Sequence, residues 1–201
     1  MSLKRTLDFC ISFFGLVLLA PFFAMIALAI RLESPGPAFF LQERVGYRGR
    51  LFRIVKFRTM RRNAPKEGPQ ITIGADPRIT RIGGWLRKTK LDELPQLINV
   101  LKGDMSLVGP RPEVPAFMSR YPTEQRDLIL SVRPGITDFA AIEFSDEADI
   151  LARADDPQEA YVNEVMPRKF ALYKRYVDGQ SLWLDLKLIG KTLAKISGAG
   201  K

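Results

Sequence analysis

Apolar positions along this chain fall into one long run and several short ones. The long run covers residues 9–30, contains no charged side chain, and lies between Lys4-Arg5 and Arg31. Roughly 20 apolar residues are enough for a helix to cross a bilayer. The run therefore predicts a membrane-embedded helix. A cleaved signal peptide is one alternative, but the run exceeds the ~7–15 apolar residues usual in such peptides.

Pro21 divides this run into two halves. A proline inside a helix removes a backbone hydrogen bond and kinks the backbone, so each half measures ~17 Å by helical rise, about one leaflet. Positive charge flanks both ends of the run, and nearly all other basic residues follow it, which favours keeping both ends cytoplasmic. We therefore expect residues 1–33 to form a re-entrant helix-break-helix that enters and leaves the membrane at one face. A spanning helix that tolerates the proline is the alternative.

The shorter apolar segments predict one mixed α+β domain over residues 34–201, which we expect to lie in the cytoplasm. Residues 38–41 and 51–57 are expected to pair as a short strand hairpin across a glycine-containing turn. Several short or amphipathic helices complete the predicted fold.

Among these helices, residues 81–90 predict a basic one, and the apolar period of residues 94–101 predicts another that ends at Gly103. Residues 63–77 are polar and rich in proline and glycine, and we expect a lid there. The last helix is expected to open at Ser181. Its apolar and lysine stripes suit either the headgroup interface or packing against the core.

Composition narrows the chemistry. Lys and Arg outnumber Asp and Glu by 31 to 22, which predicts an anionic partner: nucleic acid, an acidic membrane, or phosphorylated substrates. The chain has no histidine, and its one cysteine, Cys10, lies in the apolar run, which excludes a disulfide framework and a zinc cluster. Acid–base work would fall to carboxylates, Lys, Tyr or the substrate.

Two adjacent carboxylates, Asp92 and Glu93, precede the helix of residues 94–101. If Asp92 is the N-cap, Pro95 falls in the first turn, where its missing N–H costs nothing. The helix dipole there favours ionised carboxylates and also a bound phosphate. Because these anions repel each other, a divalent cation would mediate their contact. On spacing alone, an ordinary helix cap explains Asp92 at least as well.

Five basic side chains are candidates for holding phosphate. Lys56 and Arg58 are two apart on a predicted strand and would share a face. Arg87 closely precedes the carboxylates, whereas Arg111 and Arg133 lie in proline-containing turns and carry the side chain best suited to clamping a diphosphate bidentately. The simpler interpretation is a basic face beside anionic headgroups, with arginines that pin loops.

The run LDELPQLINVLKGDMS at residues 91–106, followed by GPRP at 109–112, resembles the signature of the bacterial monotopic phosphoglycosyl transferases. The resemblance implies transfer of a sugar-1-phosphate from a UDP-sugar to polyprenyl phosphate, with undecaprenyl phosphate as the expected form. It places the reaction at the cytoplasmic face of the bacterial inner membrane. It implies that Asp92 attacks as nucleophile, that a phosphosugar–aspartate intermediate forms as UMP leaves, and that Glu93 is its partner.

The resemblance also implies a re-entrant N-terminal helix, and Mg²⁺ held by Asp92 and Glu93. It places the motif at residues 56–60 beside the active site, from which we take Lys56 and Arg58 as substrate ligands. Two departures stand out. Ala20 stands where many members of the family have a serine before the proline. Residues 138–141 read DFAA where the commoner pattern is GLAQ, so the identity of the transferred sugar is not implied.

The absence of histidine fits this chemistry. An aspartate with an unperturbed pKa of ~3.9 is ionised at neutral pH and can attack phosphorus without a base. The acceptor phosphate, with a second pKa of ~6 by analogy with phosphoserine, is likewise largely ionised. The remaining obstacle is repulsion between anions, which Mg²⁺ and arginines would relieve.

The competing hypothesis is a membrane-tethered basic binding module for nucleic acid or acidic partners. The sequence shows no groove-reading element and no aromatic stacking platform, so we expect no nucleic-acid partner. Membrane lipids are expected partners, and a homodimer is left open.

Overall fold

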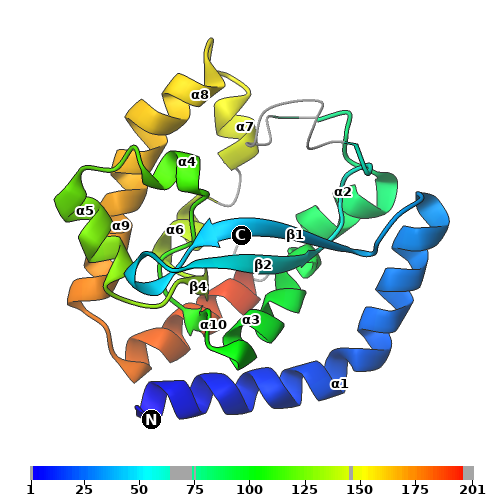
Figure 1. Ribbon diagram of the computed structural model, residues 1–201, viewed down its shortest axis with the longest axis horizontal. Coiled ribbons are helices and arrows are strands. Elements are labelled where there is room, and N and C mark those ends of the chain that lie inside the picture. Colours follow the sequence, from blue (N-terminus) through cyan, green and yellow to red (C-terminus); the bar gives the residue numbers. More distant parts are fainter. Residues whose placement is uncertain (1, 64–73, 75, 145–146, 197–201) are drawn as a thin grey trace.

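The computed structural model describes residues 2–63, 74, 76–144 and 147–196, which form a helix-rich α+β structure with two small sheets. Most of the polar loop expected to act as a lid lies outside these residues. The helix α1 (Leu3–Glu33) is long and apolar enough to cross a membrane. It contains Pro21, and Figure 1 shows it bending between a half along the lower edge and a half rising towards α2. The expected break is thus a bend within one continuous helix.

The predicted hairpin is present. Strands β1 (Phe39–Val45) and β2 (Leu51–Phe57) pair antiparallel around the short helical turn η1 (Tyr47–Gly49). β1 extends beyond the predicted residues because its polar second half pairs with the apolar second strand along its whole length.

A second sheet was not predicted. Strands β3 (Ser106–Val108) and β4 (Gly135–Thr137) pair in parallel. Their chains approach so closely at Gly109 and Gly135 that a Cβ on Gly135 would stand 2.1 Å from the Gly109 nitrogen. Only glycine fits at that crossing.

Short helices surround these sheets. The chain forms α2 (Arg81–Lys88), η3 (Leu91–Gln96), α3 (Leu97–Lys102), α4 (Pro115–Met118), α5 (Thr123–Leu130), α6 (Phe139–Glu143), α7 (Glu147–Leu151), α8 (Pro157–Ala160), the π-helical η4 (Tyr161–Val165), α9 (Met166–Asp178) and α10 (Leu182–Ile196). α10 opens directly after Ser181, as predicted, and that serine's Oγ accepts a bond from the Leu184 amide at 3.2 Å. Tyr173 and Tyr176 of α9 are fully buried in two neighbouring parts of the core.

The N-terminal end of α1 is tied to the domain by polar contacts. Lys4 pairs with Asp185 of α10 at 2.6 Å, and Arg5 donates to the Val100 and Leu101 carbonyls at 2.6 and 3.0 Å. Those carbonyls lie in the last turn of α3, where backbone acceptors lack helical partners. Asp8, buried within α1, accepts hydrogen bonds from the Ser106 hydroxyl and the Leu107 amide. The sequence analysis did not predict this contact.

The C-terminal end of α1 is tied to the same domain. Arg58 of β2 donates to the carbonyls of Ile30, Ser34 and Pro35 and to the Ser34 hydroxyl, at 2.7–3.3 Å. Glu33 accepts from the Ile82 amide at the start of α2 at 3.2 Å. Both ends of the apolar helix are therefore fastened to one body.

Candidate functional site

The carboxylate pair lies in η3, a tight helical segment that precedes α3. Lys90 initiates it in a left-handed conformation with φ 57°, so Lys90 and not Asp92 is the N-cap. The expectation that Asp92 caps the helix was therefore wrong: Asp92 and Glu93 lie in the first turn instead. α3 ends at Gly103, which adopts φ 95°, as predicted.

Glu93 is held between two cations. Lys56 of β2 bonds one of its oxygens at 2.8 Å, and Arg111 bonds both, at 2.6 and 3.1 Å. Burial alone would raise the pKa of Glu93, but Arg111 and Lys56 together hold it well below its usual range. Glu93 is thus an ionised anchor at neutral pH.

Asp92 is in a different situation from its neighbour. It is buried, at 8% exposure, yet its carboxylate accepts no hydrogen bond or ion pair from the described residues. Burial, and then the charge of Glu93, raise its pKa, while Lys56, Arg87 and Arg111 oppose that rise. A buried carboxylate that is surrounded by cations but bonded to none of the described ones is unusual, because buried charges are normally paired.

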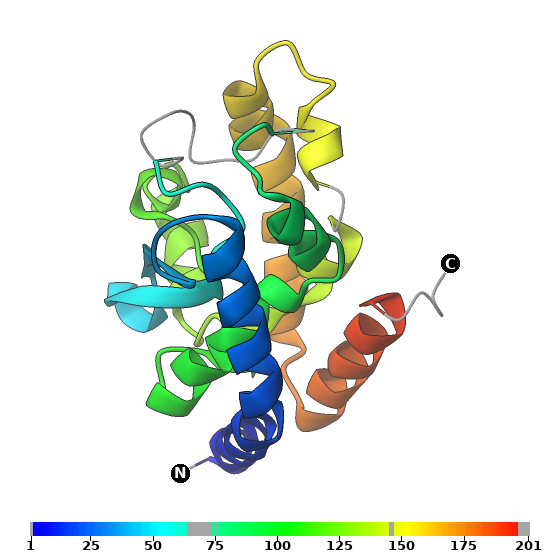
Figure 2. The same ribbon diagram turned by 90° about the vertical axis from the view of Figure 1, so that its right-hand side faces the viewer.

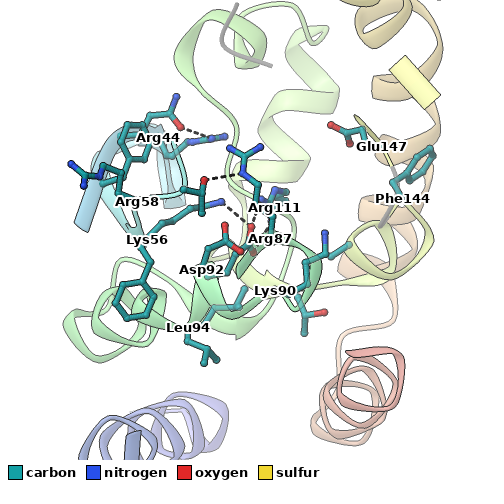
Figure 3. A pocket seen from close by; sticks show the side chains of 18 of the residues that line it. Arg44, Lys56, Arg58, Arg87, Lys90, Asp92, Leu94, Arg111, Phe144 and Glu147 are labelled. Atoms are coloured by element: carbon teal, nitrogen blue, oxygen red, sulfur yellow. Dashed lines mark hydrogen bonds and ion pairs between the residues drawn. The ribbon is translucent and has the colours of Figure 1, made fainter. Parts of the chain in front are cut away.

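Asp92 opens into a cavity of about 1510 Å³. Figure 3 shows Asp92 in the middle of this space, with Lys56 and Arg58 on one side and Phe144 and Glu147 on the other. Of the predicted site residues, Lys56, Arg58, Arg87, Asp92, Glu93 and Arg111 all line the cavity. The structure therefore brings six of them together.

Arg87 and Arg58 bond residues outside the cluster of Lys56, Glu93 and Arg111. Arg87 donates from Nε to the Thr59 hydroxyl at 2.8 Å, which orients its guanidinium, and burial lowers its pKa. Arg58 directs its bonds to the end of α1, so its clear role is structural, and its contact with substrate stays a prediction.

Arg133 is placed elsewhere. It is exposed, donates from Nε to the Gly103 carbonyl at 3.0 Å, and lies 5.5 Å over the Tyr47 ring. It is not among the residues that line the cavity. Its turn presents the arginine to the end of α3, so the structure does not group it with the other phosphate candidates.

The sequence analysis missed several cavity residues. Arg44, Glu113, Tyr161, Lys169 and Tyr173 line the region beyond Arg111. Glu113 follows the GPRP motif directly, and Lys169 and Tyr173 are four apart on one helix, but their chain separation hid the cluster.

The DFAA departure has a local structural role. Asp138 is the N-cap of α6, with one oxygen accepting from the Ala141 amide at 2.6 Å. Burial raises its pKa to about 6. This aspartate starts a helix, and it does not line the cavity.

The chain is similar to known proteins over nearly its whole length. The family model described as bacterial sugar transferase matches residues 1–198. The UDP-N-acetylgalactosamine-undecaprenyl-phosphate N-acetylgalactosaminephosphotransferase of Aeromonas hydrophila is 40% identical over 196 residues, covering 96% of this chain and 43% of the relative. The undecaprenyl-phosphate glucose phosphotransferase of Komagataeibacter xylinus is 38% identical, covering 96% and 35%.

The UDP-glucose:undecaprenyl-phosphate glucose-1-phosphate transferase of Caulobacter vibrioides is 39% identical over 197 residues, covering 96% of this chain and 69% of that relative. The chain thus spans less than half the length of the Aeromonas and Komagataeibacter proteins. The match over residues 1–198 nevertheless shows the family, and the chain belongs to the bacterial sugar transferases.

Proposed function

We propose that this chain transfers a sugar-1-phosphate from a UDP-sugar to polyprenyl phosphate through a covalent intermediate on Asp92. One observation carries the proposal: a buried carboxylate that no described residue bonds, facing a large cavity, beside a second carboxylate anchored by Lys56 and Arg111. The names of the relatives, which act on N-acetylgalactosamine or glucose and undecaprenyl phosphate, support the substrate class.

In the first step, an oxygen of Asp92 attacks the sugar-linked phosphorus. The new oxygen–phosphorus bond forms as the bond to the UMP oxygen breaks, and UMP leaves with that electron pair. In the second step, a phosphate oxygen of the acceptor attacks the same phosphorus, and Asp92 leaves as carboxylate. Neither step requires proton abstraction, which suits a chain without histidine.

The surrounding side chains prepare Asp92 for this role. Its raised pKa makes the carboxylate more basic than an ordinary aspartate, while Lys56, Arg87 and Arg111 keep the ionised form accessible. The same cations would stabilise charge on the diphosphate and on the departing UMP. Glu93 fixes Lys56 and Arg111, so these cations are already in place before substrate arrives.

The residues present fit a magnesium ion that arrives with its substrate. In the described part of the chain, no group of three or more His, Cys, Asp or Glu residues could hold a metal alone. Mg²⁺, however, is commonly bound by one or two carboxylates together with substrate phosphates. Asp92, which no described residue bonds, would supply one carboxylate. Both oxygens of Glu93 already accept from Lys56 or Arg111, so Glu93 would hold the ion only through its remaining lone pairs. When bound, the ion would neutralise charge on the diphosphate.

We also propose that α1 is re-entrant and that the domain lies on the cytoplasmic side of the inner membrane. In support, both ends of α1 are bonded to the same domain, which a helix with ends on opposite membrane faces would not allow. Figures 1 and 2 show α10 at the same end of the molecule as the N-terminal half of α1, and the Lys4–Asp185 pair joins them. α10 packs Leu188 inward and exposes Trp183 (77%) and Leu193 (61%), as an interfacial helix would.

The cavity offers the acceptor an apolar approach. Ile11 of α1 and Ile189, Leu193 and Ile196 of α10 line the same cavity as Asp92. A polyprenyl chain could therefore rest between these helices with its phosphate directed at the aspartate. No observation favours the basic binding module, because Lys56 and Arg111 bond Glu93 and do not form an open basic face.

The test is UMP release from UDP-sugars by the protein in nanodiscs containing undecaprenyl phosphate. Asp92→Asn should abolish UMP release, whereas Asp104→Asn, an acid of the same motif outside the cavity, should keep near wild-type rates. EDTA should stop turnover, and added Mg²⁺ should restore it. Wild-type rates in Asp92→Asn would reject the assignment.

A further inference from the structure

The cavity has a polar end whose side chains have no part in the steps described above. Tyr161 donates to one oxygen of Glu113 at 2.7 Å, and Lys169 donates to the Tyr161 oxygen at 3.3 Å. Lys169 also pairs with Glu147. Glu113, Tyr161 and Lys169 are each under 5% exposed, and all four residues line the cavity.

Tyr173 adds an unpartnered donor to this end. It is fully buried, yet its hydroxyl bonds to no partner in the described residues, although the residue lines the cavity. Burial raises its pKa well above its usual value, so the hydroxyl keeps its proton at neutral pH. The second oxygen of Glu113 likewise accepts no hydrogen bond from the part of the chain described. An unsatisfied buried polar group is costly, which points to a ligand that completes it.

The chemistry of this end differs from that beside Asp92. The region around Asp92 carries Lys56, Arg87 and Arg111 and suits a diphosphate. At the polar end, the carboxylates of Glu113 and Glu147 offset the charges of Arg44 and Lys169, so this end has no excess positive charge to attract one. Neutral hydroxyl and amide groups, by contrast, can both donate to Glu113 and accept from Tyr173 or Lys169.

The two ends are adjacent. Arg111, which bonds Glu93, and Glu113 are two residues apart in a proline-bracketed extended segment, so they are separated by about 6–7 Å of chain. A sugar whose phosphate meets Asp92 would thus reach the polar end directly.

We propose that Glu113, Tyr161, Lys169 and Tyr173 form the subsite that binds the sugar of the UDP-sugar and selects among sugars. This inference rests on the proposed function. The subsite belongs to α9 and η4 together with the segment after GPRP. It lies beside the departure at residues 138–141, because Ala140 and Ala141 line the same cavity and the charge of Asp138 helps to raise the pKa of Tyr173.

The test uses an isosteric variant and a matched control. Tyr173→Phe removes only the unpartnered hydroxyl, and Tyr121→Phe removes a second buried hydroxyl that is also unpartnered in the described residues but whose residue does not line the cavity. UMP release is measured with UDP-glucose, UDP-galactose and their 2-acetamido counterparts. UMP is also used as a product inhibitor of each variant.

Tyr173→Phe should lower kcat/KM for the preferred sugar about 5–10-fold, and Glu113→Gln about 10-fold or more, because each removes a hydrogen bond to the sugar. Both variants should reduce the ratio of kcat/KM for the preferred sugar to kcat/KM for a poor one, and both should leave inhibition by UMP unchanged. Tyr121→Phe should leave the ratios as in wild type.

Two results would overturn the inference. Sugar ratios unchanged in Tyr173→Phe and Glu113→Gln would make this end of the cavity structural, and weakened UMP inhibition with unchanged ratios would assign it to the uridine. Both presuppose an active wild type, so they are distinct from failure of the proposed function, in which wild-type protein releases no UMP from any UDP-sugar.

Discussion

Arg58 was predicted to bind substrate, but its hydrogen bonds hold the end of the membrane helix. A substitution at Arg58 can separate these two roles. It is 6% exposed, and its guanidinium makes four hydrogen bonds to the end of α1, with donor–acceptor distances of 2.7 to 3.3 Å. Arg58→Met keeps the aliphatic stem and removes all four bonds. The freed carbonyls belong to a helix end and the turn after it, where few other backbone partners exist.

The expected cost follows from these contacts. A hydrogen bond to a charged group contributes about 1.5–3 kcal/mol to the free energy of unfolding. The four bonds share one side chain, and the Pro35 carbonyl can bond water once the guanidinium is gone, so their contributions do not add. We therefore expect a total loss of about 3 kcal/mol. For a chain of this size, 1 kcal/mol shifts Tm by about 2–4 °C, so Tm should fall by about 6–12 °C. The KM for the UDP-sugar should stay near the wild-type value.

Thermal unfolding in detergent measures the effect, and Arg53→Met provides the control. Arg53 is an exposed residue of the same strand whose side chain bonds to none of the described residues, so its loss should cost about 0.5 kcal/mol or less. An unchanged Tm in Arg58→Met, together with a clearly raised KM, would refute the anchoring role and would show that Arg58 binds substrate instead.

Two further predictions concern the charge around Asp92 and the path of α1. Because the pKa of Asp92 is raised, kcat/KM should fall on acidification at a pH above the usual pKa of an aspartate. Glu93→Gln should move this acidic limb to lower pH and Lys56→Met to higher pH, and shifts of the same sign in pH–rate profiles would contradict these electrostatics. In a Cys10→Ser background, Ser2→Cys should react with a membrane-impermeant maleimide in inverted vesicles and stay unlabelled in spheroplasts. The opposite pattern would indicate a spanning helix.

Local sequence signals predicted the elements that local physics determines. The second hairpin strand, the end of α3 at Gly103 and the start of α10 after Ser181 follow from β-branched content, a left-handed glycine and a serine cap. The parallel pairing of β3 with β4 could not be predicted, because each strand has three residues and the partner lies far along the chain.

The candidate site was likewise predicted only in part. Residue type and motif selected Asp92, Glu93, Lys56 and Arg111, and the structure brings them to one cavity. Sequence could not distinguish which acceptor each arginine would meet, because carbonyls at a helix end and phosphate oxygens attract the same guanidinium. Arg58 bonds the end of α1, and its contact with substrate stays a prediction.

The pKa of Asp92 also had to be revised. From sequence it was assigned the value of a free aspartate, but burial beside Glu93 raises it. Burial depends on how β2, η3 and the GPRP segment pack together, and no local pattern encodes that arrangement.

The most direct test of the account is the mass of the enzyme itself. Incubated with a UDP-sugar and Mg²⁺ but without polyprenyl phosphate, the wild-type protein should gain the mass of one phosphosugar, located by peptide mapping on the peptide containing Asp92, with release of up to one equivalent of UMP. Adding the acceptor should discharge the adduct, and Asp92→Asn should never form it. An active enzyme that releases UMP only with acceptor present and never carries a phosphosugar would contradict the covalent route.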